Sequence, residues 1–282
     1  MVRQIILNGF VLGATISLMA IGFTLIFGIL RVVNFWHGEA YMFGAVLIFF
    51  LRQEAGLNYV LAVAISVVAV AALGLLSDQT IMRRFRGDMM GGVIATIALY
   101  LLFQNVMWYI LGGRPRGVSP VLTDNVTVLG THISAGRLIV VIVSFIAIAA
   151  LGLFINRTRL GKMMRAVQQD REAAQIQGIN ANRIYGMTFA IATGLAALAG
   201  ALIAPIYTVT PVMGGGPLML TFIVVIVGGL GSISGAFIAS FIIGFQQSFT
   251  AAYWGSEFSL AVSFGLALLI LLVLPRGLRG QE

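Results

Sequence analysis

The second half of the chain contains a long run without charge. From Ile184 to Ser256 there is no Asp, Glu, Lys, Arg or His side chain. A soluble fold needs charged groups on its surface, whereas a helix that crosses about 30 Å of hydrocarbon needs about 20 apolar residues. Because the run is long enough for several such helices, the sequence predicts an all-α membrane protein.

The rest of the sequence has the same character. Charged residues make up 9% of the chain, against about 25% in a soluble domain. The net charge of +8 comes mainly from short stretches between apolar segments, which favours the positive-inside bias of membrane proteins over nucleic-acid binding. The chain has no Cys, which excludes disulfides and Cys-ligated metal sites. The apolar stretch at the amino terminus is longer than a signal-peptide core, so we expect it to be retained as the first span.

The alternation of apolar and polar segments predicts one domain, residues 1–282, built as a polytopic bundle of about eight or nine transmembrane segments. Residues 112–136 are expected to form an ordered outer loop. The expected segments are residues 4–30, 40–51, 59–76, 91–111, 138–155, 184–206, 218–230, 236–249 and 258–274.

Breaks follow the first and the sixth of these segments. Residues 31–41 place polar side chains between two apolar segments, and residues 207–217 contain two prolines and repeated glycines. Irregular backbone at membrane depth is tolerated only inside protein or beside water, so we expect interrupted helices. The two interrupted segments are expected to run in opposite directions, which predicts an inverted repeat with a path between its halves. A further helix break is expected at Gly228, Gly229, Gly231, Ser232 and Gly235.

Asn34, His37 and Glu39, in the first break, have two interpretations. They could line a path or gate, because ionisable groups near hydrocarbon are costly and usually functional. They could instead cap a helix at the interface, with Glu39 in a first turn favoured by the helix dipole. The residues alone leave both interpretations open.

The longest polar stretch, residues 156–183, predicts the orientation. Its basic residues outnumber its two acids, Asp170 and Glu172. Cytoplasmic loops are rich in Lys and Arg, so we expect this stretch on the cytoplasmic side. The same side then receives Arg31, the basic residues 83–86 and the carboxyl terminus, and the amino terminus lies outside.

A short helix over residues 171–177 is expected within this stretch. Asp170 is a candidate N-cap, Glu172 places an acid in the first turn, and Gly178 can adopt the left-handed conformation that ends a helix. The helix is too short to be stable alone, and its charges find no opposite partner at i+3 or i+4. Something else must hold it, either lipid phosphates or a soluble partner subunit.

No motif indicates catalysis. Gly161-Lys162 is followed by Met163 and lacks the earlier glycine of a phosphate-binding loop. His37 and His132 lack metal-ligand spacing. The sequence G-S-I-S-G around Ser232 lacks the strand–turn–helix context of a nucleophile elbow. We therefore expect that the chain is not an enzyme and has no cofactor or metal of its own.

Several blocks resemble a known family. E-A-A-Q-I-Q-G, residues 172–178, resembles the E-A-A-x-x-x-G signature with which permeases of ATP-binding-cassette importers dock on their ATPases. The I-x-L-P that follows in the wider signature is missing after Gly178. Longer blocks, in order and spread over nearly the whole chain, resemble the branched-chain amino acid permeases of the LivH type. They are L-R-V-V-N-F-W-H-G-E-A-Y-M-F-G-A, R-L-G-K-M-M-R-A-V-Q-Q-D-R-E-A-A, I-V-V-I-V-G-G-L-G-S-I-S-G-A and L-P-R-G-L.

This resemblance implies the permease of an importer in the bacterial inner membrane, which forms the path for leucine, isoleucine or valine. The implied partners are a second, related permease in a heterodimer, two cytoplasmic ATPases and an extracytoplasmic binding protein. The resemblance also implies a coupling loop at residues 157–183, with residues 170–178 as its coupling helix. The implied docking residues are Arg165, Asp170, Arg171, Glu172, Ala173, Ala174 and Gly178.

Two alternatives compete with this interpretation. Importers for urea, amides or other amino or aromatic acids have related permeases that share these blocks. An ion-coupled secondary transporter would also explain an inverted repeat, but the charge-free second half leaves no carboxylate there for a proton relay.

Overall fold

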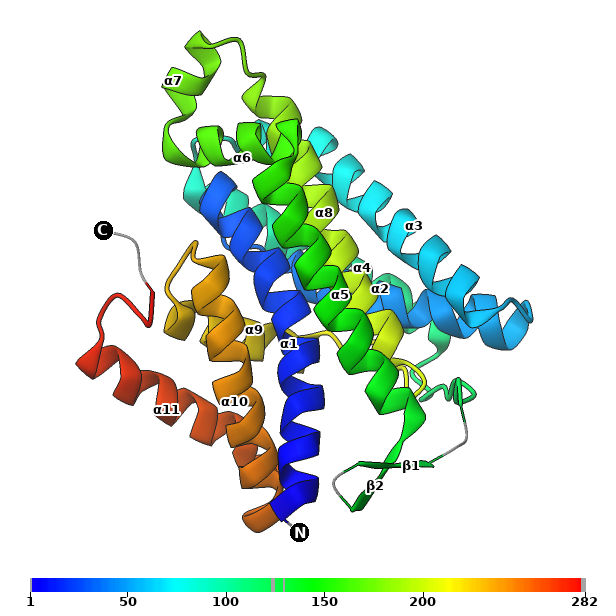
Figure 1. Cartoon of the computed structure of the whole chain (residues 1–282). Coiled ribbons are helices and arrows are strands. Elements are labelled where there is room, and N and C mark those ends of the chain that lie inside the picture. Colours follow the sequence, from blue (N-terminus) through cyan, green and yellow to red (C-terminus); the bar gives the residue numbers. More distant parts are fainter. Residues whose placement is uncertain (1, 123–124, 129, 280–282) are drawn as a thin grey trace.

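The computed structural model describes residues 2–122, 125–128 and 130–279, which form a helical bundle with one small antiparallel hairpin (Figure 1). The hairpin consists of β1 (Asn125–Val128) and β2 (Thr131–Ser134), with Val126 opposite Ile133. The helices are α1 (Val2–Leu30), α2 (Trp36–Ile48), α3 (Tyr59–Thr80), α4 (Met89–Leu111), α5 (Ala135–Arg157), α6 (Arg159–Gln169), α7 (Arg171–Ile176), α8 (Ala181–Ile203), α9 (Gly215–Gly228), α10 (Ile233–Tyr253) and α11 (Ser259–Val273).

Within the described residues, seven helical stretches are long and apolar enough to cross a membrane. Two more helices, α2 and α9, are shorter, with 13 and 14 residues. Each follows a break in the chain, after α1 and after α8 respectively. The predicted all-α polytopic bundle with interrupted helices is thus confirmed. The seven stretches are α1, α3, α4, α5, α8, α10 and Ser256–Val273.

Helices α1 and α8 form the centre of the bundle. An apolar stretch of 18 residues in α1 is 83% buried inside the bundle, and the equivalent stretch of α8 is 72% buried. In α4 and in α5 the buried share of this stretch is only 22%. Small residues permit this packing, because helix association in lipid depends on close approach of the backbones. Gly44 of α2 faces the backbone of Ala197 in α8, and Gly200 of α8 faces the backbone of Tyr41 in α2. A Cβ atom at either glycine would collide with the opposite helix.

The two halves of the chain repeat the same pairing. Helix α1 packs most extensively against α10, and α8 packs most extensively against α3. The short helices follow this pattern, since α2 packs on α8 and α9 packs on α1. Figure 1 shows α1 rising toward α6, whereas α8 descends from α7, so the two central helices run in opposite directions. This arrangement is that of the inverted repeat expected from the sequence.

The helix boundaries differ from the sequence prediction in the first break. Helix α2 begins at Trp36, whereas the sequence predicts a segment from Ala40, and a π-helical turn at Phe49–Glu54 extends it. The polar character of His37 and Glu39 favoured a break across residues 31–41. Both side chains are nevertheless buried, because α2 packs against α8 and lies beside α1 and α9.

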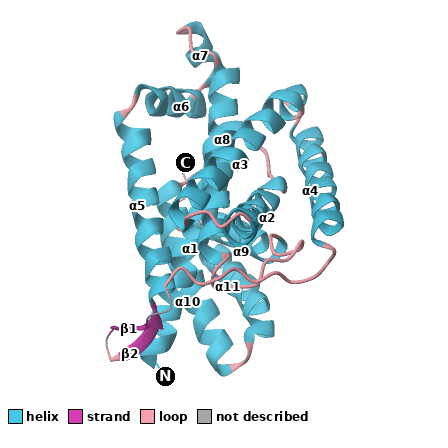
Figure 2. Ribbon diagram, turned by 90° about the vertical axis from the view of Figure 1, so that its right-hand side faces the viewer, coloured by secondary structure: helices cyan, strands magenta, loops and turns pink. Residues whose placement is uncertain are grey.

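Figure 2 shows α6 and α7 at one end of the bundle and the hairpin and amino terminus at the other. Some basic residues of the hairpin end contact neighbouring loops and helices. The Arg52 guanidinium donates to the Pro120 carbonyl at 2.8 Å, and that of Arg137 donates to Asn8 at 2.7 Å. The basic residues of 156–183 lie at the α6–α7 end, so the charges flank the bundle at both ends.

Candidate functional site

Helix α7 is defined by caps at both ends. The Asp170 carboxylate accepts a hydrogen bond from the Ala173 N–H at 3.0 Å, as an N-cap does. At the other end, Gly178 has φ +79°, its N–H donates to Gln175, and the Ile179 N–H donates to Ala174. This pair of hydrogen bonds is the Schellman motif. The predicted caps are therefore present, and the helix ends at Ile176, one residue earlier than expected.

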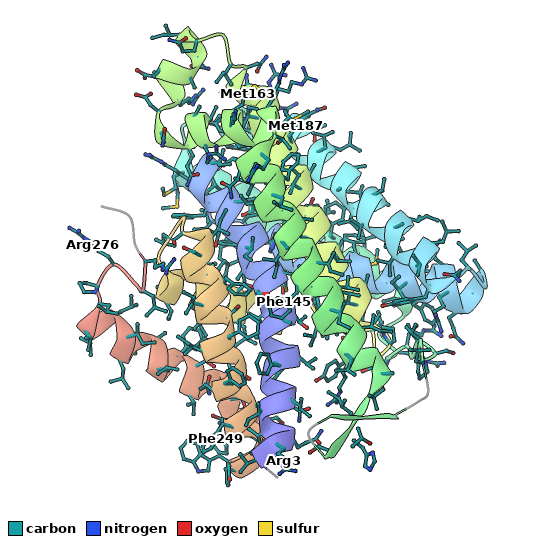
Figure 3. The ribbon with its side chains drawn as sticks, viewed as in Figure 1. Arg3, Phe145, Met163, Met187, Phe249 and Arg276 are labelled. Carbon is teal, nitrogen blue, oxygen red and sulfur yellow. The ribbon has the colours of Figure 1, made fainter. Side chains whose placement is uncertain are left out.

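Helix α6 directly precedes α7 and packs against it. It was not predicted from the sequence. The Thr158 hydroxyl caps α6 by accepting from the Gly161 N–H at 3.0 Å. Gly161, Met164 and Val167 form its buried side, and Figure 3 shows Met163 and Met187 at the junction of α6 and α8. The apolar spacing Leu160, Met164, Val167 at i, i+4 and i+7 is the signal that indicates this helix.

Arg165 differs from the other implied docking residues. Its guanidinium donates to the carbonyl of Ile155 and lies 3.4 Å from the Asn156 amide oxygen. It thus satisfies backbone at the end of α5, where helical carbonyls lack intrahelical partners. This contact gives Arg165 a role in fixing α6 against α5.

Most of α7 points away from the bundle. Ala174 is buried, whereas the side chain of Ile176 is 84% exposed. An apolar side chain so exposed at the tip of a short helix is typical of a contact surface, and the sequence analysis did not single it out. The other implied docking residues on α7 are exposed: Asp170, Arg171, Glu172, Ala173 and Gly178.

Tyr185 of α8 links α7 to the bundle. The guanidinium of Arg171 lies 5.7 Å from the centre of its ring, and that of Arg86 lies 4.8 Å from it. Arg86 in turn forms an ion pair of 2.6 Å with Asp78 of α3 and donates to Asn182. A continuous set of contacts therefore runs from α7 through Tyr185 to α3 and α8. The lone acid Asp78 in the apolar α3 was the available sequence signal for it.

Asn34, His37 and Glu39 lie inside the protein. All three are fully buried. The His37 Nε2 atom lies 3.0 Å from the Met19 carbonyl of α1, and within the described residues both Glu39 carboxylate oxygens lack a hydrogen-bond partner. Glu39 lies in the first turn of α2, but α2 has no side-chain N-cap. The position is central in the bundle, near the break between α1 and α2.

The glycine-rich segment between α9 and α10 forms the third break. Gly229 and Gly231 have φ of +99° and +85°, and Ser232 caps α10 by accepting from the Gly235 N–H at 3.2 Å. A Cβ at Gly228 would collide with the backbone of Gly235. The carboxyl-terminal segment binds here, since the Leu278 N–H donates to the Val227 carbonyl at 2.8 Å.

Comparison with known proteins identifies the family. The model of the permease component of branched-chain amino acid transport systems matches residues 5–273. The chain belongs to this family. The high-affinity branched-chain amino acid transport system permease protein LivH of Escherichia coli is 33% identical, over 99% of this chain and 95% of its own length. BraD of Pseudomonas aeruginosa, named as the same kind of permease, is 32% identical with the same coverage. No solved structure matches the chain.

This branched-chain permease is therefore a transport component. Its family blocks fall on the features described above: the α1–α2 break, the α6–α7 element, the α9–α10 break and the carboxyl-terminal segment. The linking residues Tyr185, Arg86 and Asp78 lie outside the quoted blocks.

We predict that Tyr185→Ala loosens α7 while Tyr185→Phe does not. The ring holds one guanidinium of α7, that of Arg171, and a cation–π contact at an exposed site contributes about 0.5–1 kcal/mol. Loss of this contact should speed amide exchange of Ala173 and Ala174 by roughly 2- to 5-fold. Hydrogen–deuterium exchange of the permease in detergent measures this effect. Equal exchange in the Ala and Phe variants would show that the ring does not hold α7.

Proposed function

We propose that this permease forms half of the membrane path of an ATP-binding-cassette importer for leucine, isoleucine and valine. The observation that carries the proposal is the 32–33% identity to LivH and BraD over 99% of the chain. The proposed partners are a second, related permease in a heterodimer, two cytoplasmic ATPases and an extracytoplasmic binding protein. The proposed location is the bacterial cytoplasmic membrane.

The charge-free second half constrains how substrate is recognised. Helices α8, α9 and α10 carry no charged side chain except Arg183 in the first turn of α8. Helices without charged side chains cannot bind both the carboxylate and the ammonium group of an amino acid tightly. Selection would therefore reside mainly in the binding protein, and the permease would supply a path that substrate can leave.

Helix α7 is proposed as the coupling helix. Its exposed Glu172 and Ile176 offer an acid and an apolar anchor to a partner. Closure of the ATPases on ATP would move α7, and α6 and Tyr185 would transmit this movement to α5, α8 and α3. Since α3 packs on α8 and α1 crosses α8, this movement would change the side toward which the path opens.

Reconstitution tests the transport function. Proteoliposomes with both permeases, both ATPases and the binding protein should take up labelled leucine only with ATP. Unlabelled isoleucine and valine should compete, and urea and acetamide should not. Uptake driven by an ion gradient without the ATPases would overturn the importer assignment, and preference for urea or acetamide would overturn the substrate class.

The proposed orientation places the amino terminus outside and the α6–α7 end in the cytoplasm, as the positive-inside bias predicts. Because the chain has no Cys, single cysteines report on each side without interference. In intact spheroplasts, an impermeant maleimide should label Thr127→Cys in the hairpin and leave Gln175→Cys in α7 unlabelled. Both positions are exposed, so the reverse pattern would invert the proposed topology.

Charge reversal tests the coupling role. Glu172→Lys should lower leucine uptake per ATP hydrolysed by roughly tenfold or more, the effect of losing one hydrogen bond to a charged group. Glu54→Lys is the matched control, because Glu54 is an exposed acid at the opposite end of the bundle. Normal membrane levels with normal coupling in Glu172→Lys would refute docking through this carboxylate.

A further inference from the structure

A cavity of about 490 Å³ lies beneath the α6–α7 element. Its wall combines the end of α1, the turn between α3 and α4, the junction of α6 with α7, and Tyr185. The size lies within the range of about 300–1,000 Å³ that is usual for small-molecule pockets. It is separate from the buried cluster of Asn34, His37 and Glu39, none of which lines it.

Arg31 lines this cavity in an unusual backbone conformation. It has φ +56°, and among the described residues every other residue with positive φ is glycine. Its N–H donates to the Phe27 carbonyl at 2.9 Å and ends α1. Glycine would fill this left-handed position at lower conformational cost. The benefit of arginine must therefore come from its side chain, which is exposed and has no hydrogen-bond or ion-pair partner within the described part of the chain.

The same cavity is lined by three acids and by two further arginines, Arg86 and Arg171, whose guanidiniums lie over the Tyr185 ring. Glu172 is also without a partner among the described residues, whereas Asp88 and Asp170 each use one carboxylate oxygen to cap a helix, α4 and α7 respectively. Apolar side chains complete the wall: Ile29, Val32, Met82 and Phe85. The cavity thus offers an unpaired guanidinium at Arg31, carboxylate oxygens without a partner and a hydrocarbon surface in one place.

We propose that this cavity binds a zwitterionic amino acid with an apolar side chain. The Arg31 guanidinium would bind the carboxylate, the oxygens of Asp88 and Asp170 that do not cap a helix would bind the ammonium group, and the apolar wall would bind the side chain. Three acids and three arginines line the cavity, and one of the arginines, Arg86, is already paired with Asp78, so the remaining charges favour a zwitterion over a polyanionic phosphate group. A bound amino acid would fix α7 against the ends of α1 and α3.

This inference rests on the proposed function, which supplies both the ligand and the orientation. The cavity then opens at the cytoplasmic end, where imported amino acid accumulates. Ligand in it would hold the coupling helix in one position and slow the transport cycle. The cavity is thus a site for inhibition by the imported product.

The test uses the complete transporter in nanodiscs of phosphatidylcholine, with its binding protein already saturated by leucine. Additional free leucine, in the millimolar range, should lower ATPase activity. Leucinamide, which lacks the carboxylate, and N-acetyl-leucine, which lacks the ammonium group, should not. Equilibrium dialysis of labelled leucine without the binding protein should show binding to the same complex.

The decisive variant is Arg31→Gly, because glycine accepts the positive φ and removes only the side chain. It should retain stimulation by the loaded binding protein and require roughly tenfold more leucine for inhibition and for binding, as expected for one charge-assisted hydrogen bond. Arg84→Gln is the matched control, since Arg84 is exposed at the same end and does not line the cavity. It should behave as the wild type.

Three results would overturn the site: no inhibition of the wild type, equal inhibition and binding in Arg31→Gly, or inhibition that follows the anionic lipid content of the nanodisc and not leucine. Failure of the proposed function looks different. In that case leucine-loaded binding protein would not stimulate the wild-type ATPase at all.

Discussion

The backbone must satisfy its own hydrogen bonds inside hydrocarbon, and the arrangement of this bundle follows from that requirement. Breaks in the helices are possible only where protein surrounds them. The chain therefore encloses its two short helices with the two most buried of its long apolar helices: α2 packs on α8, and α9 packs on α1. Close glycine contacts, such as Gly44 on Ala197, make this enclosure possible.

Outside the hydrocarbon the stabilising interactions change. Helix α7 has six residues, too few for stability by its own backbone. Caps at Asp170 and Gly178 close its ends, Ala174 anchors it, and the Tyr185 ring holds Arg171 beside Arg86. From the sequence alone, lipid phosphates or a soluble partner subunit were the candidates for holding this short helix. The structure shows a third answer, an aromatic ring of the same chain.

Local signals predicted much of this fold, and long-range contacts could not be predicted. The lengths of the apolar stretches predicted the membrane-spanning helices. Asp170 and Gly178 predicted the ends of α7, because helix caps depend on residues that are close in the sequence. The beginning of α2 at Trp36 was missed because burial of His37 and Glu39 is supplied by distant helices. The pairing of Asp78 with Arg86 and the approach of Arg86 to Tyr185 likewise join separate segments, and no spacing rule reports them. Helix α6 was missed although its apolar spacing is visible in the sequence.

Unpaired polar groups divide into two sets with different consequences. Glu39 and Asn34 are fully buried near the centre of the bundle, where an unsatisfied polar group costs free energy in every state that leaves it so. Such groups favour states that hydrate or pair them, and they lie beside the break between α1 and α2. Arg31 and Glu172 are exposed at the α6–α7 end and carry no such penalty. The first set therefore bears on the conformation of the helices around this break, while the second is accessible from solvent at the end of the bundle that carries α7.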